Sequence, residues 1–188
     1  MAVGDGQVLD REVDASVHYP WSGDCTSETT CILGGRCCET DTDCTSGHTC
    51  TITDGQNTGL TIFGWLAQLN SAGFAGHRDW RIPKSAANPN YPSNGQPAEL
   101  ESILAAPYQC SVGPPCVDAA FNTSTSCGEG DCSATGPMAC SCTQSSRYWS
   151  GTEFNVPIYA WDVDFGSGLV QFDTYPSVFH VRAVRGGL

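Results

Sequence analysis

Basic residues are scarce in this chain. Only 8 lysines and arginines stand against 20 aspartates and glutamates, which gives a formal net charge of −12. Such a charge repels nucleic acids and anionic membrane surfaces, and no lysine or arginine stripe offsets it. No run of about 18 apolar residues offers a membrane-spanning helix. The composition therefore argues against nucleic-acid binding and against a membrane-spanning role.

Catalytic motifs are also missing. The 4 histidines, His18, His48, His77 and His180, belong to no nucleophile-elbow or metal-binding motif. Serine and aspartate are plentiful, but their abundance does not define a catalytic triad. We therefore predict that the chain is not an enzyme.

Cysteine, in contrast, is abundant, with 12 residues in a chain of 188. The spacing contains no C-x-x-C pair, which disfavours a structural zinc site. An even and dense set of cysteines indicates disulfide bonds formed in an oxidising compartment, hence a secreted or cell-surface protein. The sequence does not specify how they pair. The cysteines are Cys25, Cys31, Cys37, Cys38, Cys44, Cys50, Cys110, Cys116, Cys127, Cys132, Cys140 and Cys142.

The length and hydrophobic content fit a single domain, residues 1–188, with its own core. Its opening residues, Met1 to Asp5, have neither the charged nor the apolar region of a signal peptide. Export is therefore inferred from the cysteines alone.

Two helices are expected in residues 54–106. Asn57 or Thr58 can cap the first, and Gly73 can end it. Its apolar face would consist of Leu60, Phe63, Ala67 and Leu66. The second helix is expected to start at Pro97, with an apolar side formed by Leu100, Ile103 and Leu104.

Antiparallel strands are expected near the C-terminus. Residues 161–165 (WDVDF) alternate apolar and acidic side chains, which is typical of a half-buried strand. A turn at residues 166–168 leads to a return strand at 169–172, and residues 180–185 suggest a third strand. Helices followed by antiparallel strands indicate an α+β domain with short antiparallel sheets and long loops.

Separated blocks over about residues 55–188 resemble one known family. Residues 73–83 (GFAGHRDWRIP) and 99–103 (ELESI), then 148–152 (YWSGT) with 160–165 (AWDVDF), and finally 181–187 (VRAVRGG) are similar in order and spacing to the Lcl C-terminal domain family. The resemblance implies a C-type lectin-like fold, related to the formylglycine-generating-enzyme group, and a binding role in surface or secreted proteins.

The chain also departs from that family pattern. The Cys-rich segments at about residues 25–50 and 107–142 look like insertions. Formylglycine-generating enzymes use a cysteine pair in the C-terminal part of this fold, whereas no cysteine follows Cys142 here. This difference supports a non-enzymatic reading.

We expect most motif residues to be structural. Asp79 and Arg81 would hold a loop through an ion pair or a backbone bond, and Arg182 and Arg185 would pair with acidic side chains or loop carbonyls. The aromatic anchors of the core would be Trp80, Trp149 and Trp161.

The ligand-presenting region is expected at about residues 147–187. Residues 154–159 and 171–180 carry aromatic and β-branched side chains in expected loops, which is typical of a binding surface. Phe154, Ile158, Phe172 and Phe179 fit either core or surface, while Tyr159, Tyr175, Thr174 and His180 are expected to be exposed. The predicted ligand-binding residues are Phe154, Val156, Ile158, Tyr159, Gln171, Phe172, Thr174, Tyr175, Val178, Phe179 and His180.

These observations favour an extracellular recognition or adhesion domain for a protein or glycan on another cell or surface. The residue types in the two segments also resemble the outcome of adenine-directed mutation in a diversity-generating retroelement variable protein. The alternative is an invariant lectin-like adhesin or a structural module of a larger surface protein. No cofactor is predicted, although Asp162 with Asp164, or Asp41 with Asp43, could offer oxygens to calcium.

Overall fold

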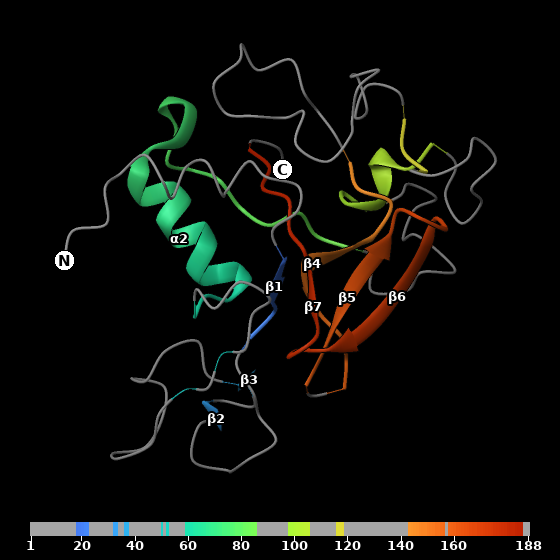
Figure 1. The fold of residues 1–188 in the computed structure, drawn as a ribbon, viewed down its shortest axis with the longest axis horizontal. Coiled ribbons are helices and arrows are strands. Elements are labelled where there is room, and N and C mark those ends of the chain that lie inside the picture. The colour runs from blue at the N-terminus through green and yellow to red at the C-terminus, as the bar shows by residue number, and fades with distance from the viewer. Residues whose placement is uncertain are drawn as a thin grey trace.

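A computed structural model describes residues 18–22, 32–33, 36–37, 50, 52, 59–85, 98–105, 116–118, 143–156 and 158–185. The described helical elements are α2 (Ile62–Ala72) and the 3-10 helices η3 (Phe74–Gly76) and η5 (Glu101–Ile103). The described strands are β1 (His18–Pro20), β2 (Ile32–Leu33), β3 (Arg36–Cys37), β4 (Arg147–Glu153), β5 (Tyr159–Asp164), β6 (Leu169–Thr174) and β7 (Val178–His180). This part of the chain is mixed α and β, with α2 on one side and β4, β5 and β6 on the other (Figure 1).

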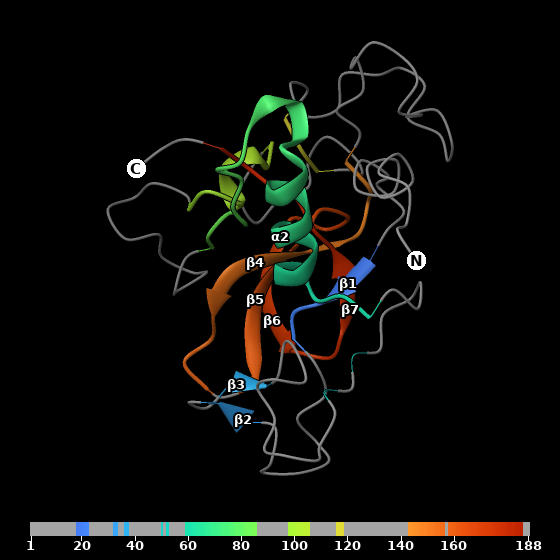
Figure 2. The ribbon, with the colours of Figure 1, turned by 90° about the vertical axis from the view of Figure 1, so that its left-hand side faces the viewer.

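One five-stranded sheet, in the order β1-β7-β4-β5-β6, organises the described residues, and β2 and β3 form a separate pair. Strands β4, β5 and β6 follow one another antiparallel, as the sequence predicted for 161–165 and 169–172. Strand β7 lies parallel to β4 and antiparallel to β1, with His18 opposite His180. Segments far apart in the sequence therefore lie side by side in the middle of the molecule (Figure 2).

Helix α2 begins later than predicted. Its N-cap is Thr61, whose Oγ1 accepts a hydrogen bond of 3.1 Å from the Gly64 amide, so the caps predicted at Asn57 or Thr58 are wrong. Gly73 ends the helix in the left-handed conformation (φ 68°), as predicted. The buried side chains are Ile62, Trp65 and Leu69, whereas Ala67 is exposed and Leu60, Phe63 and Leu66 are only partly buried. The buried face is therefore rotated from the predicted one, because Ile62, Trp65 and Leu69 are the residues of the helix that point into the first core.

The second predicted helix is a single 3-10 turn, η5. Leu104 is already extended (ψ 136°) and forms an isolated bridge with Val117, which draws the chain out of the helix. Leu100, Ile103 and Leu104 are nevertheless buried, as expected for one apolar side. Pro97 lies outside the described residues.

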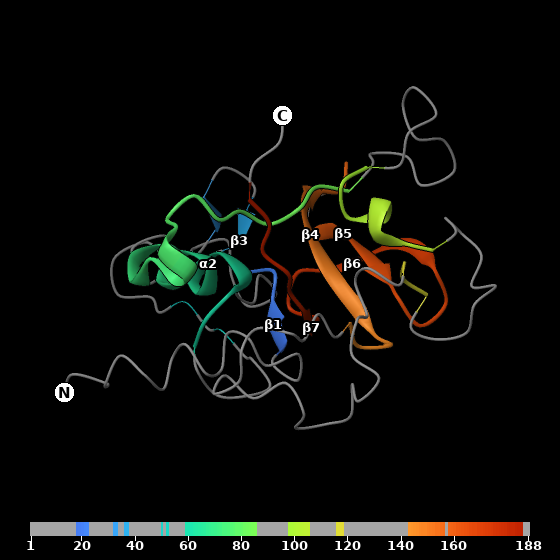
Figure 3. The same cartoon turned by 90° about the horizontal axis from the view of Figure 1, so that it is seen from above.

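Two hydrophobic cores use alternate residues of the sheet. The first packs α2 against Trp149, Tyr19 and Trp21, and the second packs the η5 region against Tyr148 and other sheet residues. Viewed from above, α2 and η5 lie at opposite ends of the sheet (Figure 3). The predicted anchors Trp149 and Trp161 are buried in these cores, and Trp80 packs partly buried against the first.

Ion pairs fasten the motif loops. Arg81 pairs with Glu99, and Arg185 Nε donates to Asp79 Oδ1 at 2.9 Å, so Asp79 and Arg81 each form an ion pair, as predicted, and Arg185 has an acidic partner. The hydrogen bond from Arg185 lowers the pKa of Asp79 below its usual value. Arg182 instead donates to the Thr143 hydroxyl and lies over the Tyr148 ring.

Two cysteines have described side chains, Cys50 and Cys116, and both are in disulfide bonds. The side chains of the other ten predicted disulfide cysteines, and most of the two Cys-rich segments, lie outside the described residues. None of the helices in the described part of the chain has the length and apolar character needed to cross a membrane.

Candidate functional site

The β5–β6 hairpin presents two chemically different faces. Because side chains alternate along a strand, residues paired across the hairpin share a face. The apolar face carries the pairs Trp161–Phe172 and Val163–Val170. The polar face carries the pairs Asp162–Gln171 and Asp164–Leu169, so Asp162 and Asp164 do share the face opposite Trp161 and Val163.

An aromatic cluster of Phe154, Tyr159, Trp161 and Phe172 lies at the open margin of the apolar face. Phe172 stacks on Phe154 with ring centroids 4.0 Å apart, and it meets Tyr159 and Trp161 edge-on at 5.7 and 5.8 Å. Trp161 is buried, but Phe172 is 45% exposed. The cluster therefore runs from the second core to solvent.

The β4–β5 loop adds two more apolar side chains beside this cluster. Val156 is 47% exposed and Ile158 is 37% exposed. Ile158 has φ 69°, a left-handed conformation that is strained for a β-branched residue. Hydrogen bonds of 2.9 Å on both sides hold this conformation, from Tyr175 N to Ile158 O and from Phe154 N to Tyr159 O. These bonds thus fix the backbone conformation in which Ile158 is presented.

The predicted exposure of Tyr175 and His180 is wrong. Tyr175 is 2% exposed because its ring stacks on Trp21 at 4.4 Å. His180 is 5% exposed, between the rings of His18 at 3.9 Å and Tyr148 at 4.9 Å. Both lie where β1 covers the C-terminal segment, a contact between residues more than a hundred positions apart.

Strand β7 as a whole belongs to the scaffold. It lies inside the sheet between β1 and β4, so both edges of its backbone adjoin other strands; His180 is buried, and Val178 and Phe179 are partly buried. Phe179 packs against the first core, 4.7 Å from the Trp149 ring, and Val178 lies opposite Pro20. The predicted ligand-binding residues 178–180 are therefore separated by β4 from Tyr159 and Trp161, and by β4 and β5 from Phe172.

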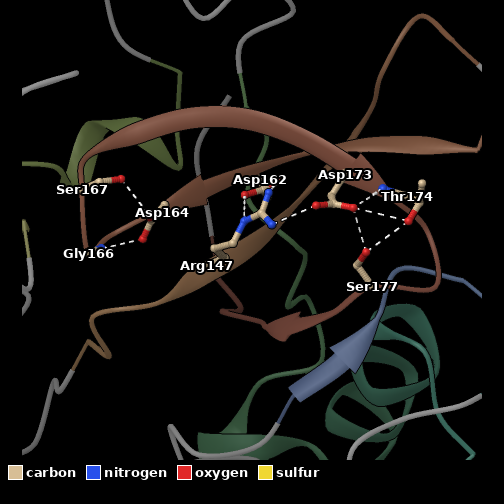
Figure 4. A network of polar contacts seen from close by, with 8 residues as sticks. All are labelled: Arg147, Asp162, Asp164, Gly166, Ser167, Asp173, Thr174 and Ser177. Carbon is tan, nitrogen blue, oxygen red and sulfur yellow. Dashed lines mark hydrogen bonds and ion pairs between the residues drawn. The ribbon is translucent and has the colours of Figure 1, made fainter.

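Arg147 ties the polar face together, and sequence reasoning missed it (Figure 4). Its Nε and Nη2 donate to the two oxygens of Asp162 at 3.0 and 3.1 Å, and its Nη1 donates to Asp173 Oδ2 at 2.8 Å. Gln171, with its amide oxygen turned to Arg147, accepts from Nε at 2.8 Å. The alternation of residues 161–165 predicted a charged strand face, but nothing local indicated the cation from β4.

The other carboxylate oxygen of Asp173 also accepts hydrogen bonds. Asp173 Oδ1 accepts from the Thr174 amide at 2.7 Å and from Ser177 Oγ at 2.8 Å. Thr174 and Gln171, both predicted to contact ligand, thus help to hold this network. We name the group Arg147, Asp162, Gln171, Asp173 and Ser177 the polar network.

The electrostatics of the two carboxyl groups differ. Burial raises the pKa of Asp162 to about 6, and the hydrogen bonds from Arg147 only partly oppose that rise. Burial also tends to raise the pKa of Asp173, but the hydrogen bonds from Ser177, the Thr174 amide and Arg147 outweigh it, and the pKa lies below its usual value. Asp162 is 0% exposed and depends on Arg147 for its charge.

The aspartates considered for calcium have internal partners. Asp164 accepts from the Gly166 amide at 2.8 Å and from Ser167 Oγ at 2.6 Å, in the turn after β5. Asp162 is engaged by Arg147 through both oxygens. These contacts use oxygens that a calcium ion would need. Asp41 and Asp43 lie outside the described residues.

The geometry defines a mixed α and β domain in which Trp149 is buried in the first core. The exposed large apolar side chains of the described residues lie in the β5–β6 hairpin and the β4–β5 loop. A family model matches residues 21–185, and the chain belongs to the Lcl C-terminal domain family. This membership indicates a domain of the surface or adhesion type. No curated protein and no solved structure matches the chain.

Proposed function

We propose that this chain is a non-catalytic, extracellular recognition domain that binds a protein or glycan through the aromatic cluster and the β4–β5 loop. One observation carries the proposal. The large hydrophobic side chains that are exposed in the described part of the chain all fall between residues 156 and 172. They are Val156, Ile158, Leu169 and Phe172. Leu169 projects from the polar face, whereas Phe172 belongs to the aromatic cluster and Val156 and Ile158 to the β4–β5 loop. Exposed apolar groups on and beside an ordered sheet favour binding, because little entropy is lost when a partner covers them.

Further arguments support the finer parts of this proposal. Disulfide bonds at Cys50 and Cys116 favour an oxidising compartment, hence secretion or the cell surface. A C-type lectin-like fold accounts for the pairing of β1 with β7 and for a helix packed beside them.

Diversification by a retroelement is a separate hypothesis about the same surface. It concerns Phe154, Val156, Ile158 and Phe172, whose side chains can change without reaching the first core. Sequencing the flanking DNA tests it. A reverse transcriptase with an imperfect template repeat that differs at adenines would support it, and the absence of both would end it.

The binding proposal is tested with V156S, F172S and the double variant on a glycan array and a displayed random peptide library. Leu169→Ser is the matched control, because Leu169 is 49% exposed on the same hairpin but faces the other way. Binding that is lost in the double variant, kept in L169S and accompanied by unchanged melting supports recognition. Equal binding by all variants would reject this surface.

A further inference from the structure

The two edges of the five-stranded sheet are built differently. Strand β1 is short and ends in Pro20, a residue without an amide donor, so it is protected against pairing with another strand. Strand β6 spans six residues, pairs with β5 in a regular register, and contains neither proline nor lysine. In natural sheets an edge of this kind is a template for another strand.

The hydrogen-bond pattern identifies the backbone groups that point away from the sheet. The Tyr175 amide donates to Ile158 O, which makes the next pair, Tyr159–Thr174, a non-hydrogen-bonded one. By alternation, Val170, Phe172 and Thr174 direct their amides and carbonyls outward, while Gln171 bonds to β5. The Thr174 amide already donates to Asp173 Oδ1. Val170 and Phe172 therefore carry the open groups, and no strand of the described residues pairs with this edge.

The charge of the molecule indicates which kind of strand can pair with this edge of β6. A second copy would bring another net charge of −12 to the same place, which disfavours self-pairing. On the polar face, within the described residues, Arg147 is the one cation bonded to Asp162 and Asp173, and Asp164 lies on the same face. On the other face Phe172 offers an apolar ring. A complementary strand carries basic side chains on one face and apolar ones on the other.

We propose that the open edge of β6 pairs, through the backbone of Val170 and Phe172, with an extended partner-protein segment that alternates apolar and basic side chains. This inference rests on the proposed recognition function and narrows its ligand to a protein. The ring of Phe172 is stacked by Phe154 on one side and touched edge-on by Tyr159 and Trp161, an arrangement that suits apolar packing better than stacking of a sugar. Strand addition supplies affinity through main-chain bonds and specificity through alternate side chains.

The test uses a short synthetic peptide that alternates valine and lysine, added to the full chain. Hydrogen exchange is read at individual amides. We expect new protection at Val170 and Phe172, with no change at Gln171, whose amide is already bonded to β5. A peptide with N-methyl groups on the residues that face β6 should bind at least about tenfold more weakly, because its donors are lost. Equal binding by both peptides, or no binding by either, would overturn the inference.

Two variants at one position separate backbone from side chain. F172A keeps the outward amide and should weaken peptide binding only severalfold, while F172P removes that amide and should abolish binding. Proline is tolerated where the amide of an edge strand faces solvent, and an unchanged melting curve verifies that F172P is folded. If the peptide fails while array ligands still depend on Val156 and Phe172, edge pairing is wrong and recognition stands. If both fail, the proposed function falls too.

Discussion

The two faces of the β5–β6 hairpin differ in what they bury: the polar face buries a charged side chain, whereas the apolar face exposes an aromatic ring. On the polar face, Asp162 is buried more completely than most apolar residues, yet both of its oxygens are bonded to Arg147. On the apolar face, Phe172 is an aromatic ring that remains 45% exposed beside a well-filled core. The residue types alone would have suggested the reverse, with the charges outside and the ring inside.

This contrast separates scaffold from surface. A buried carboxylate with an internal cation has no bonding capacity left for a ligand, so it contributes to shape and stability. An exposed ring gains free energy only when something covers it. We therefore assign stability to the buried Arg147–Asp162 pair and recognition to the margin of the apolar face and the adjoining edge of β6, and four predictions test that division.

Arg147→Met should have the largest effect. It leaves Asp162 buried without its cation, and breaking a buried pair from one side costs about 3 to 5 kcal/mol. Asp173→Asn is the control, because Asp173 is part-exposed and its loss leaves the Arg147–Asp162 pair intact. Urea unfolding at neutral pH measures both. A cost for R147M no greater than that for D173N would show that the polar face is not held by this pair.

The pH dependence of stability should isolate Asp162. Its pKa is raised from 3.8 in the unfolded chain to about 6 in the fold, so the folded state binds this proton more tightly. Protonation of Asp162 therefore contributes its full stabilisation of the fold below about pH 4, and this stabilisation is lost as pH rises through about 6. Relative to D162N, the wild type should gain up to about 3 kcal/mol between pH 7 and 4. Asp173, with a lowered pKa, acts in the opposite sense and only at lower pH.

Urea unfolding of the wild type and D162N across that range provides the measurement. Comparing the two proteins cancels the titration of groups that they share. A stability difference that does not change with pH would mean that Asp162 is not buried as described.

Local sequence signals predicted helices and strands, but not the contacts that each of them makes in the fold. Gly73 ends α2 because a left-handed cap suits glycine, and the alternation of residues 161–165 marks β5. The helix start was missed because Asn57, Thr58 and Thr61 are all competent caps, and packing of Ile62 and Trp65 decides among them. Such choices depend on contacts that no local window contains.

Burial at the candidate site depends on distant pairing. His180 and Tyr175 lie in a stretch that the sequence suggested was a loop, but His18 and Trp21, from the other end of the chain, pack against them. Arg147 likewise meets Asp162 through the β4–β5 register. The aromatic margin was easier to predict, because Phe154, Val156, Ile158 and Phe172 are unusual residues for expected loops and turns.

Phe172→Ala tests whether the apolar face is open at its margin. Because nearly half of the ring is already in water, the substitution should cost only about 1 kcal/mol of stability. Val163→Ala, on the same face one cross-strand pair away and 0% exposed, should cost about 2 kcal/mol despite removing fewer atoms. Thermal unfolding of both variants gives the comparison. A larger loss for F172A than for V163A would place Phe172 in the scaffold.

Leu169→Ser should have the smallest effect on stability and is the closest control for Phe172, because it tests exposure without the position on the apolar face. Leu169 is 49% exposed, slightly more than Phe172, and sits on the same strand, but it projects from the polar face near the turn. Its stability change should stay within about 0.5 kcal/mol, because little buried area is lost. Array binding should also be unchanged, whereas F172S abolishes or weakens it. If L169S lost binding as strongly as F172S, exposure rather than position would govern recognition, and the division between the two faces would not hold.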